Sequence, residues 1–146
     1  MFLEKLSVSN RLATQMVNEA KKKAEQLGIH VNIAVVDSGG HLLAFERMDH
    51  APILSIEIAQ NKAYTAAAFG IPTHEWYPLI EHTPQLKAGI VHTSRLVIFG
   101  GGYPIQIGNK LAGAIGVSGG TEEEDQLCCE AALRLIENSV YTSKEG

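Results

Sequence analysis

The sequence predicts an α+β fold in which helices pack around a five-stranded antiparallel sheet. Three observations support this prediction: segments with apolar residues at helical spacing, short segments rich in β-branched residues, and tight glycine or asparagine turns between them. Short turns make neighbouring strands antiparallel, and the mixture of helices and hairpins is typical of layered α+β proteins. With 146 residues, 45% of them apolar, we expect one domain over residues 1–146 with a frayed tail from about residue 139.

The first helix is expected over residues 9–27, because its apolar residues recur at helical spacing and Gly28 follows as a stop signal. Residues 31–37 and 41–47 then form two strands joined by a Ser-Gly-Gly turn. This order predicts a first β-hairpin directly after the first helix.

A second helix is expected to begin near Pro52 and to end at Gly70, and its many alanines favour close packing. Residues 72–90 contain three prolines, a tryptophan and two histidines without a sustained period. We expect short turns there and a loop that folds over another part of the protein.

The remaining strands are predicted at residues 95–101, 103–107 and 111–117, the last two as a second hairpin around a Gly-Asn turn. A last helix is expected to begin near Thr121. The predicted order is therefore helix, two strands, helix, loop, three strands, helix.

Composition excludes several classes of function. The net charge is only −4 and the basic residues are scattered, which disfavours nucleic-acid binding. No apolar run is long enough for a membrane span or a signal peptide, so we expect a soluble, cytoplasmic protein without a membrane partner. Cys128 and Cys129 are adjacent on the last helix, which favours buried thiols over a disulfide.

The stretch VSGGTEEEDQ, residues 117–126, places Gly119 and Gly120 immediately before the last helix. Glycines at a helix start can cradle a phosphate, but Thr121 and Glu124 have the spacing of a capping box and the other acids would repel an anion. This favours a structural turn. A neutral or cationic ligand could still lie against the two glycines, with Asp125 facing it.

The stretch FGGGYP contains Gly100, Gly101 and Gly102, followed by a proline and a strand, so it is not a dinucleotide fingerprint. Two interpretations stay open: a turn or bulge between strands, and a close approach of a ligand to the backbone.

Charged residues around the second helix are further candidates. Arg47 could hold a carboxylate, and Asp49 could cap the helix or move a proton. Asn61 and Lys62 lie mid-helix, and the apolar neighbours of Lys62 predict that its ammonium group needs an acidic partner or an anionic ligand if it is shielded. An exposed lysine on the outer face is the alternative.

No histidine spacing matches a zinc motif, so we expect no metal site. One histidine beside an apolar pocket suffices for haem, which makes His74, His82 and His92 candidate iron ligands in or beside the aromatic loop. Surface or hydrogen-bonding histidines are the alternative for each of them.

Four motifs in this order, AVVDSGGHLLAFERMD, NKAYTA, FGGGYPI and IGVSGGTEEEDQ, resemble the GlcG/HbpS-like proteins, also called the haem-degrading or DUF336 domain family. The resemblance implies a profilin-like α-β-α fold with a five-stranded antiparallel sheet and a homo-oligomer, a dimer or a larger ring. It also implies haem binding for some members, and links to glycolate, diol or corrinoid metabolism for others.

Three hypotheses for the function follow: a haem- or tetrapyrrole-binding oligomer, a small-molecule enzyme or binding protein for a short carboxylate or hydroxy compound, and a structural subunit. In the enzyme hypothesis Asp49, Lys62 and Asp125 are the candidate catalytic residues. The candidate ligand-binding residues are Arg47, Asn61, Gly100, Gly101, Gly102, Gly119 and Gly120.

Overall fold

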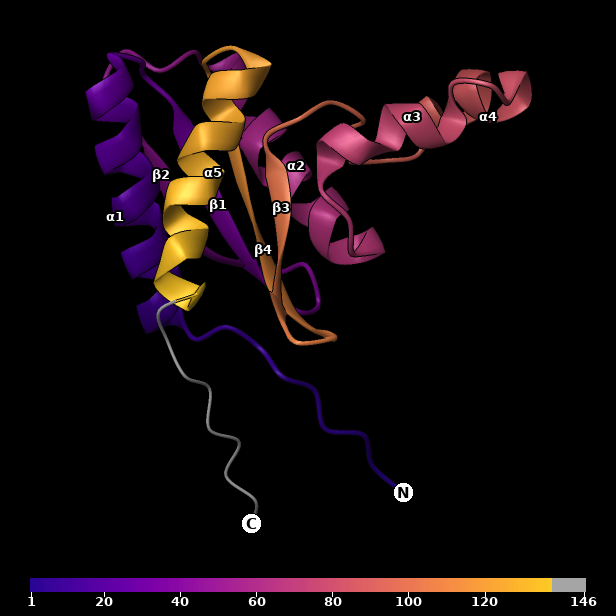
Figure 1. Ribbon diagram of the computed structural model, residues 1–146, viewed down its shortest axis with the longest axis horizontal. Coiled ribbons are helices and arrows are strands. Elements are labelled where there is room, and N and C mark those ends of the chain that lie inside the picture. Colours follow the sequence, from indigo (N-terminus) through magenta and orange to yellow (C-terminus); the bar gives the residue numbers. More distant parts are fainter. Residues whose placement is uncertain (138–146) are drawn as a thin grey trace.

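The computed structural model describes residues 1–137, so the tail expected to fray from residue 139 lies outside the described residues. The fold is α+β, with an antiparallel sheet and helices on both of its faces (Figure 1). Its main elements are α1 (Asn10–Leu27), β1 (Asn32–Asp37), β2 (Leu42–Arg47), α2 (Leu54–Phe69), β3 (Gly102–Ile107), β4 (Lys110–Ser118) and α5 (Glu122–Glu137).

The sheet has four strands among the described residues, in the order β2-β1-β4-β3, and every neighbouring pair is antiparallel. Both predicted hairpins are confirmed, β1 with β2 and β3 with β4. The central pair, β1 with β4, joins the hairpins and pairs Asn32 with Ser118.

The fifth strand, predicted at residues 95–101, is wrong, because this segment is irregular. Two of its backbone amides bond to side chains from other elements: Val97 N donates to Thr65 Oγ1 (3.0 Å), and Gly100 N donates to Glu122 Oε1 (2.6 Å). When side-chain oxygens accept the hydrogen bonds of backbone amides, these amides do not need a neighbouring strand as their partner. The profilin-like arrangement stays a prediction.

Two cores lie on the two faces of the sheet. On one face α1 and α5 pack against strand residues such as Ile33, Ile115 and Val117. On the other face α2 presents a row of alanines to Ala34 and Ala114. The α1 boundary agrees with the prediction, with Ser9 Oγ accepting from Leu12 N at the start of the helix.

Helix α2 begins at Leu54, just after the position expected from Pro52, and its first turn has no side-chain cap. Asp49 therefore does not cap this helix. The carbonyl oxygen of Pro52 accepts a hydrogen bond from Asn32 Nδ2 (3.1 Å), which ties the turn before α2 to the first strand.

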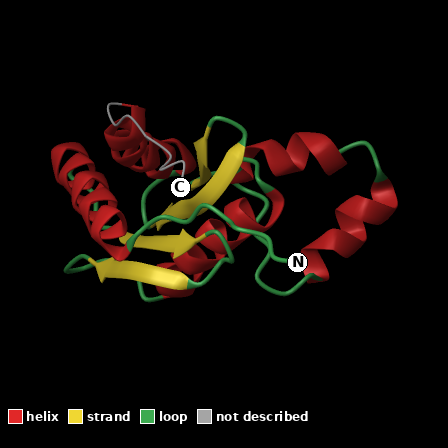
Figure 2. Cartoon of the chain, turned by 90° about the horizontal axis from the view of Figure 1, so that it is seen from below, coloured by secondary structure: helices red, strands yellow, loops and turns green. Residues whose placement is uncertain are grey.

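The segment expected to be a loop that folds over the protein instead contains short helices that project from the side of the sheet (Figures 1 and 2). We call residues 73–92 the arm; it comprises η1 (Thr73–Glu75), α3 (Trp76–Ile80), α4 (Pro84–Gly89) and η2 (Ile90–His92). Trp76 and Ile80 are buried at its base, while α4 and η2 contain no buried residue. The base of the arm contacts the FGGGYP segment, where Thr73 Oγ1 accepts a hydrogen bond from Gly102 N (2.9 Å), and the rest of the arm extends away from the sheet (Figure 1).

None of the helices within residues 1–137 is long and apolar enough to cross a membrane.

Candidate functional site

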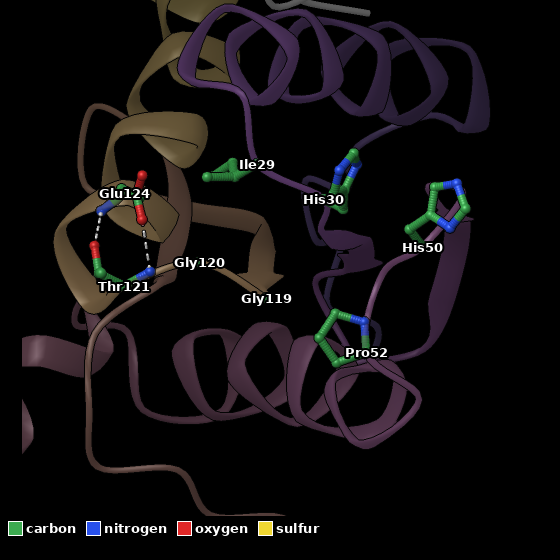
Figure 3. Close-up of a pocket in the computed structure, with 8 residues that line it drawn as sticks. All are labelled: Ile29, His30, His50, Pro52, Gly119, Gly120, Thr121 and Glu124. Atoms are coloured by element: carbon green, nitrogen blue, oxygen red, sulfur yellow. Dashed lines mark hydrogen bonds between the residues drawn. The ribbon is translucent and has the colours of Figure 1, made fainter.

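An open pocket of about 500 Å³ lies beside the glycine turn between β4 and α5. Figure 3 shows the turn on one side of this pocket and two histidines with a proline on the other. The pocket is lined by Ile29, His30, His50, Pro52, Gly119, Gly120, Thr121 and Glu124. Its volume falls in the range of small-molecule sites in proteins.

The predicted capping box is present on the wall formed by α5. Thr121 Oγ1 accepts from Glu124 N (3.2 Å), and Glu124 Oε1 accepts from Thr121 N (2.9 Å), as the dashed lines in Figure 3 mark. The first turn of α5 also carries three further acids, Glu122, Glu123 and Asp125. This helix start is therefore satisfied from within the chain, and its charge disfavours a free anion in the pocket.

Directly behind the turn, Lys62 of α2 and Asp125 of α5 form a buried ion pair. Lys62 Nζ lies 3.1 Å from Asp125 Oδ2 and also donates to Val117 O (2.9 Å). Asp125 Oδ1 accepts from Gly120 N (2.9 Å), so the pair also fixes the floor of the pocket. Of the alternatives that the sequence left open for Lys62, the structure shows a shielded lysine with an acidic partner, Asp125.

Only 2% of Lys62 and 3% of Asp125 are exposed. Burial raises the pKa of the Asp125 carboxyl, and this effect outweighs the lowering by Lys62 and by the Gly120 and Gly119 amides. In this packing the pair offers no accessible atom to a substrate, so a catalytic role for Lys62 or Asp125 would require α2 and α5 to separate.

The second glycine cluster makes room for this ion pair. A Cβ on Gly101 would lie 2.6 Å from Lys62 Nζ, and one on Gly102 would meet the backbone of Lys62. Of the two interpretations of FGGGYP, the structure therefore shows close approach, but the approaching group is the protein's own lysine. Gly100 accommodates the Glu122 and Gln126 side chains of α5 in the same way.

The two cysteines are buried, free thiols, as the sequence predicts. Cys129 Sγ donates to Gly101 O (3.2 Å), beside the ion pair. Burial raises the pKa of Cys128 to about 12 and that of Cys129 well above its ordinary value, so both groups are protonated at neutral pH.

The other candidate residues lie outside this cluster. Arg47 and Asp49 are exposed at the end of β2, line no part of the pocket, and make no side-chain hydrogen bond or ion pair within residues 1–137. Asn61 is half-buried on α2, where its Oδ1 accepts from Arg95 Nε (3.2 Å). Arg47, Lys62 and Asp125 therefore do not meet in one cavity.

The three candidate haem ligands are spread over the arm. His74 is half-buried with its ring 5.6 Å from that of Tyr103, and its Nδ1 is buried without a hydrogen-bond partner. His82 is exposed between α3 and α4, and its Nε2 lies 3.2 Å from Glu81 Oε1. His92 is exposed in η2.

The sequence interpretation missed the pair formed by His30 and His50. Their ring centroids are 5.7 Å apart in an edge-to-face arrangement. A signal for this pair was available, because residues just before the first strand of a hairpin and just after the second lie side by side. No group of three or more metal-ligating side chains occurs within the described part of the chain.

The fold and the site define an α+β protein with a helix-covered antiparallel sheet and an open pocket at a glycine turn. The family described as haem degrading protein HbpS-like matches residues 8–134. The chain belongs to this family, which confirms the resemblance noted in the sequence motifs.

Two curated relatives show how the chain compares with longer and shorter proteins. An uncharacterized 15.0 kDa protein from the dhaT-dhaS intergenic region of Citrobacter freundii is 41% identical over 122 residues, 83% of this chain and 86% of that protein. The corrinoid adenosyltransferase PduO of Citrobacter freundii is 34% identical over 132 residues, which cover 90% of this chain but only 39% of PduO.

Two solved structures have the same fold. The protein ORFY of Klebsiella pneumoniae, of family DUF336, has a TM-score of 0.88 at 34% identity, covering 95% of this chain and 97% of that one. A PduOC–haem complex has a TM-score of 0.78 at 29% identity, covering 88% and 94%.

Proposed function

We propose that this protein binds haem or another tetrapyrrole. The observation that carries the proposal is the similarity to the PduOC–haem complex, which covers 88% of this chain at 29% identity. The family description as haem degrading supports it further.

The chain has residues that fit such a group. Haem iron is held in proteins by side chains such as histidine, inside or beside an apolar pocket. The pocket at the glycine turn combines imidazoles with the apolar side chains of Ile29 and Pro52. His74, His82 and His92 on the arm remain proposed ligands as well.

The proposal is tested by titrating the purified protein with haemin and following the Soret band. We expect a sharp, saturable shift, because an imidazole that ligates the iron changes the band in proportion to occupied sites. Albumin serves as the comparison, and a shift indistinguishable from the one it produces would refute the proposal. Glutamine substitutions at His74, His82 and His92 test each arm histidine as the ligand.

A corrinoid is the second candidate ligand, since the similarity to the corrinoid adenosyltransferase PduO covers 90% of this chain. A corrin is also a metal-bearing tetrapyrrole that accepts an imidazole ligand. A parallel titration with hydroxocobalamin separates the two ligands, because only the one that binds gives a saturable spectral change at protein concentration.

We further propose that the protein acts as a homo-oligomer in the cytoplasm. A six-residue helix is not stable alone in water, yet α4 has no buried residue, and the arm exposes Tyr77, Leu79, Leu86 and Val91. A second copy of the chain would cover this apolar surface. The two free thiols are compatible with a reducing compartment.

A further inference from the structure

We propose that the His30–His50 pair would hold the iron of the bound tetrapyrrole in the pocket at the glycine turn, with one imidazole as the ligand and the other packed against it edge to face. This inference rests on the proposed function and assigns its site. It assigns the ligand to a pair that the hairpin of β1 and β2 brings together, with the three arm histidines as the alternative.

The first argument is the availability of the imidazole nitrogens. His30 and His50 are both exposed, line the same pocket and contact each other edge to face at 5.7 Å. Neither ring has a hydrogen bond or ion pair within the described residues. By contrast, Glu81 lies 3.2 Å from the His82 imidazole, and the unpartnered nitrogen of His74 is buried.

The second argument is the apolar surface next to the two rings. Ile29 and Pro52 form walls of the pocket. A macrocycle held at His30 or His50 would cover Ile29 and Pro52, which would stabilise the complex by removing apolar area from water.

The third argument is the negative charge on the pocket wall formed by α5. The wall opposite the histidines carries Glu124, and the first turn of α5 is acidic throughout. A free anion is disfavoured there, whereas a metal cation is not.

The backbone of His50 provides a clean variant for the test. His50 has φ 69, in the left-handed region that asparagine tolerates well. His50→Asn therefore removes the imidazole without introducing backbone strain at this position. Arg95→Asn is the matched backbone control, since Arg95 has φ 67 and does not line the pocket.

A second control removes an exposed histidine from the same hairpin. His41 lies at the opposite end of β1 and β2, in the turn that joins them, with its imidazole paired to Asp37. We therefore compare His30→Gln, His50→Asn and their combination with His41→Gln and Arg95→Asn. Circular dichroism spectra establish that each variant is folded.

In haemin titrations we expect each single pocket variant to raise the Kd about tenfold or more, and the double variant to lose the saturable Soret shift. Both controls should bind as the wild type does. A double variant with the wild-type Kd and spectrum would overturn this assignment while the proposed function stands, and a substitution of His74, His82 or His92 would then abolish binding. A wild type without a saturable shift would overturn both.

Discussion

Lys62 and Asp125 carry opposite charges into the interior between α2, β4 and α5. Their separation of 3.1 Å and the additional acceptors and donors, Val117 O and Gly120 N, satisfy both groups. A buried pair of this kind contributes little net stability compared with apolar residues. Removing one partner is nevertheless costly, because it leaves the other charge buried and unpaired. Its function in this fold is to hold the Gly120 turn, and with it the pocket floor, against the second helix.

This arrangement predicts the effect of breaking the pair. Asp125→Ala should lower the free energy of unfolding by about 3–5 kcal/mol, because it leaves a buried ammonium group without its partner. Adding Lys62→Met should recover part of this loss, since methionine keeps the aliphatic chain and removes the charge. Urea unfolding followed by circular dichroism measures both. Equal stabilities for the single and the double variant would contradict the explanation that the loss comes from the unpaired ammonium group of Lys62.

Helix α2 lies unusually close to the sheet, because small residues face each other on both sides of the contact. Ala59 and Ala63 present the helix backbone to Gly116 in β4. A Cβ on Gly116 would clash with the carbonyl oxygen of Ala59 and lie 2.6 Å from the amide nitrogen of Ala63. This close contact is what brings the long side chain of Lys62 to the far end of β4.

A substitution at this contact should therefore be costly. Gly116→Ala is expected to lower the free energy of unfolding by about 1–3 kcal/mol, because the added methyl group meets backbone atoms that can move only with the whole helix. Gly89→Ala is the matched control, since Gly89 ends α4 with φ −98 and a Cβ added there would have no atom within 4 Å.

For Gly89→Ala we expect unchanged or slightly higher stability, by about 0.4–1 kcal/mol, because alanine restricts the unfolded chain. Urea midpoints with an unchanged m-value would report both effects. If the two substitutions changed the midpoint equally, the close contact between α2 and β4 would not be the cause.

The whole molecule is a compact layered body with an arm on one side. Figure 1 shows α1 and α5 on the side of the sheet away from the arm. The exposed apolar residues of the arm, among them Leu79 and Leu86, have no cover from the described residues of the same chain. Assembly through the arm is the proposed way to bury them.

This proposal predicts a change in molecular mass. Leu79→Glu with Leu86→Glu should reduce the mass measured by sedimentation velocity toward that of one chain, because buried charges oppose the contact between copies. Leu127→Glu is the control, since Leu127 is an exposed leucine on α5 and not part of the arm. An unchanged mass in the double variant would argue against assembly through the arm.

The sequence was sufficient for features that depend on neighbours along the chain. Apolar spacing located α1, tight turns located both hairpins, and the Thr121–Glu124 spacing located the capping box. Each of these is decided by hydrogen bonds or periodicity within a few residues. The helical neighbours of Lys62 indicated that its ammonium group, if shielded, needs an acidic partner or an anionic ligand, but they left an exposed lysine as the alternative.

The tertiary structure decided everything that depends on residues distant in the sequence. Residues 95–101 have the composition of a strand, but the amides of Val97 and Gly100 donate to the Thr65 and Glu122 side chains. Asp125 becomes the partner of Lys62 across 63 positions of the chain, and His30 meets His50 where two strand ends lie side by side. Local patterns contain no information on such contacts, because they form only when α2, the sheet and α5 are packed together.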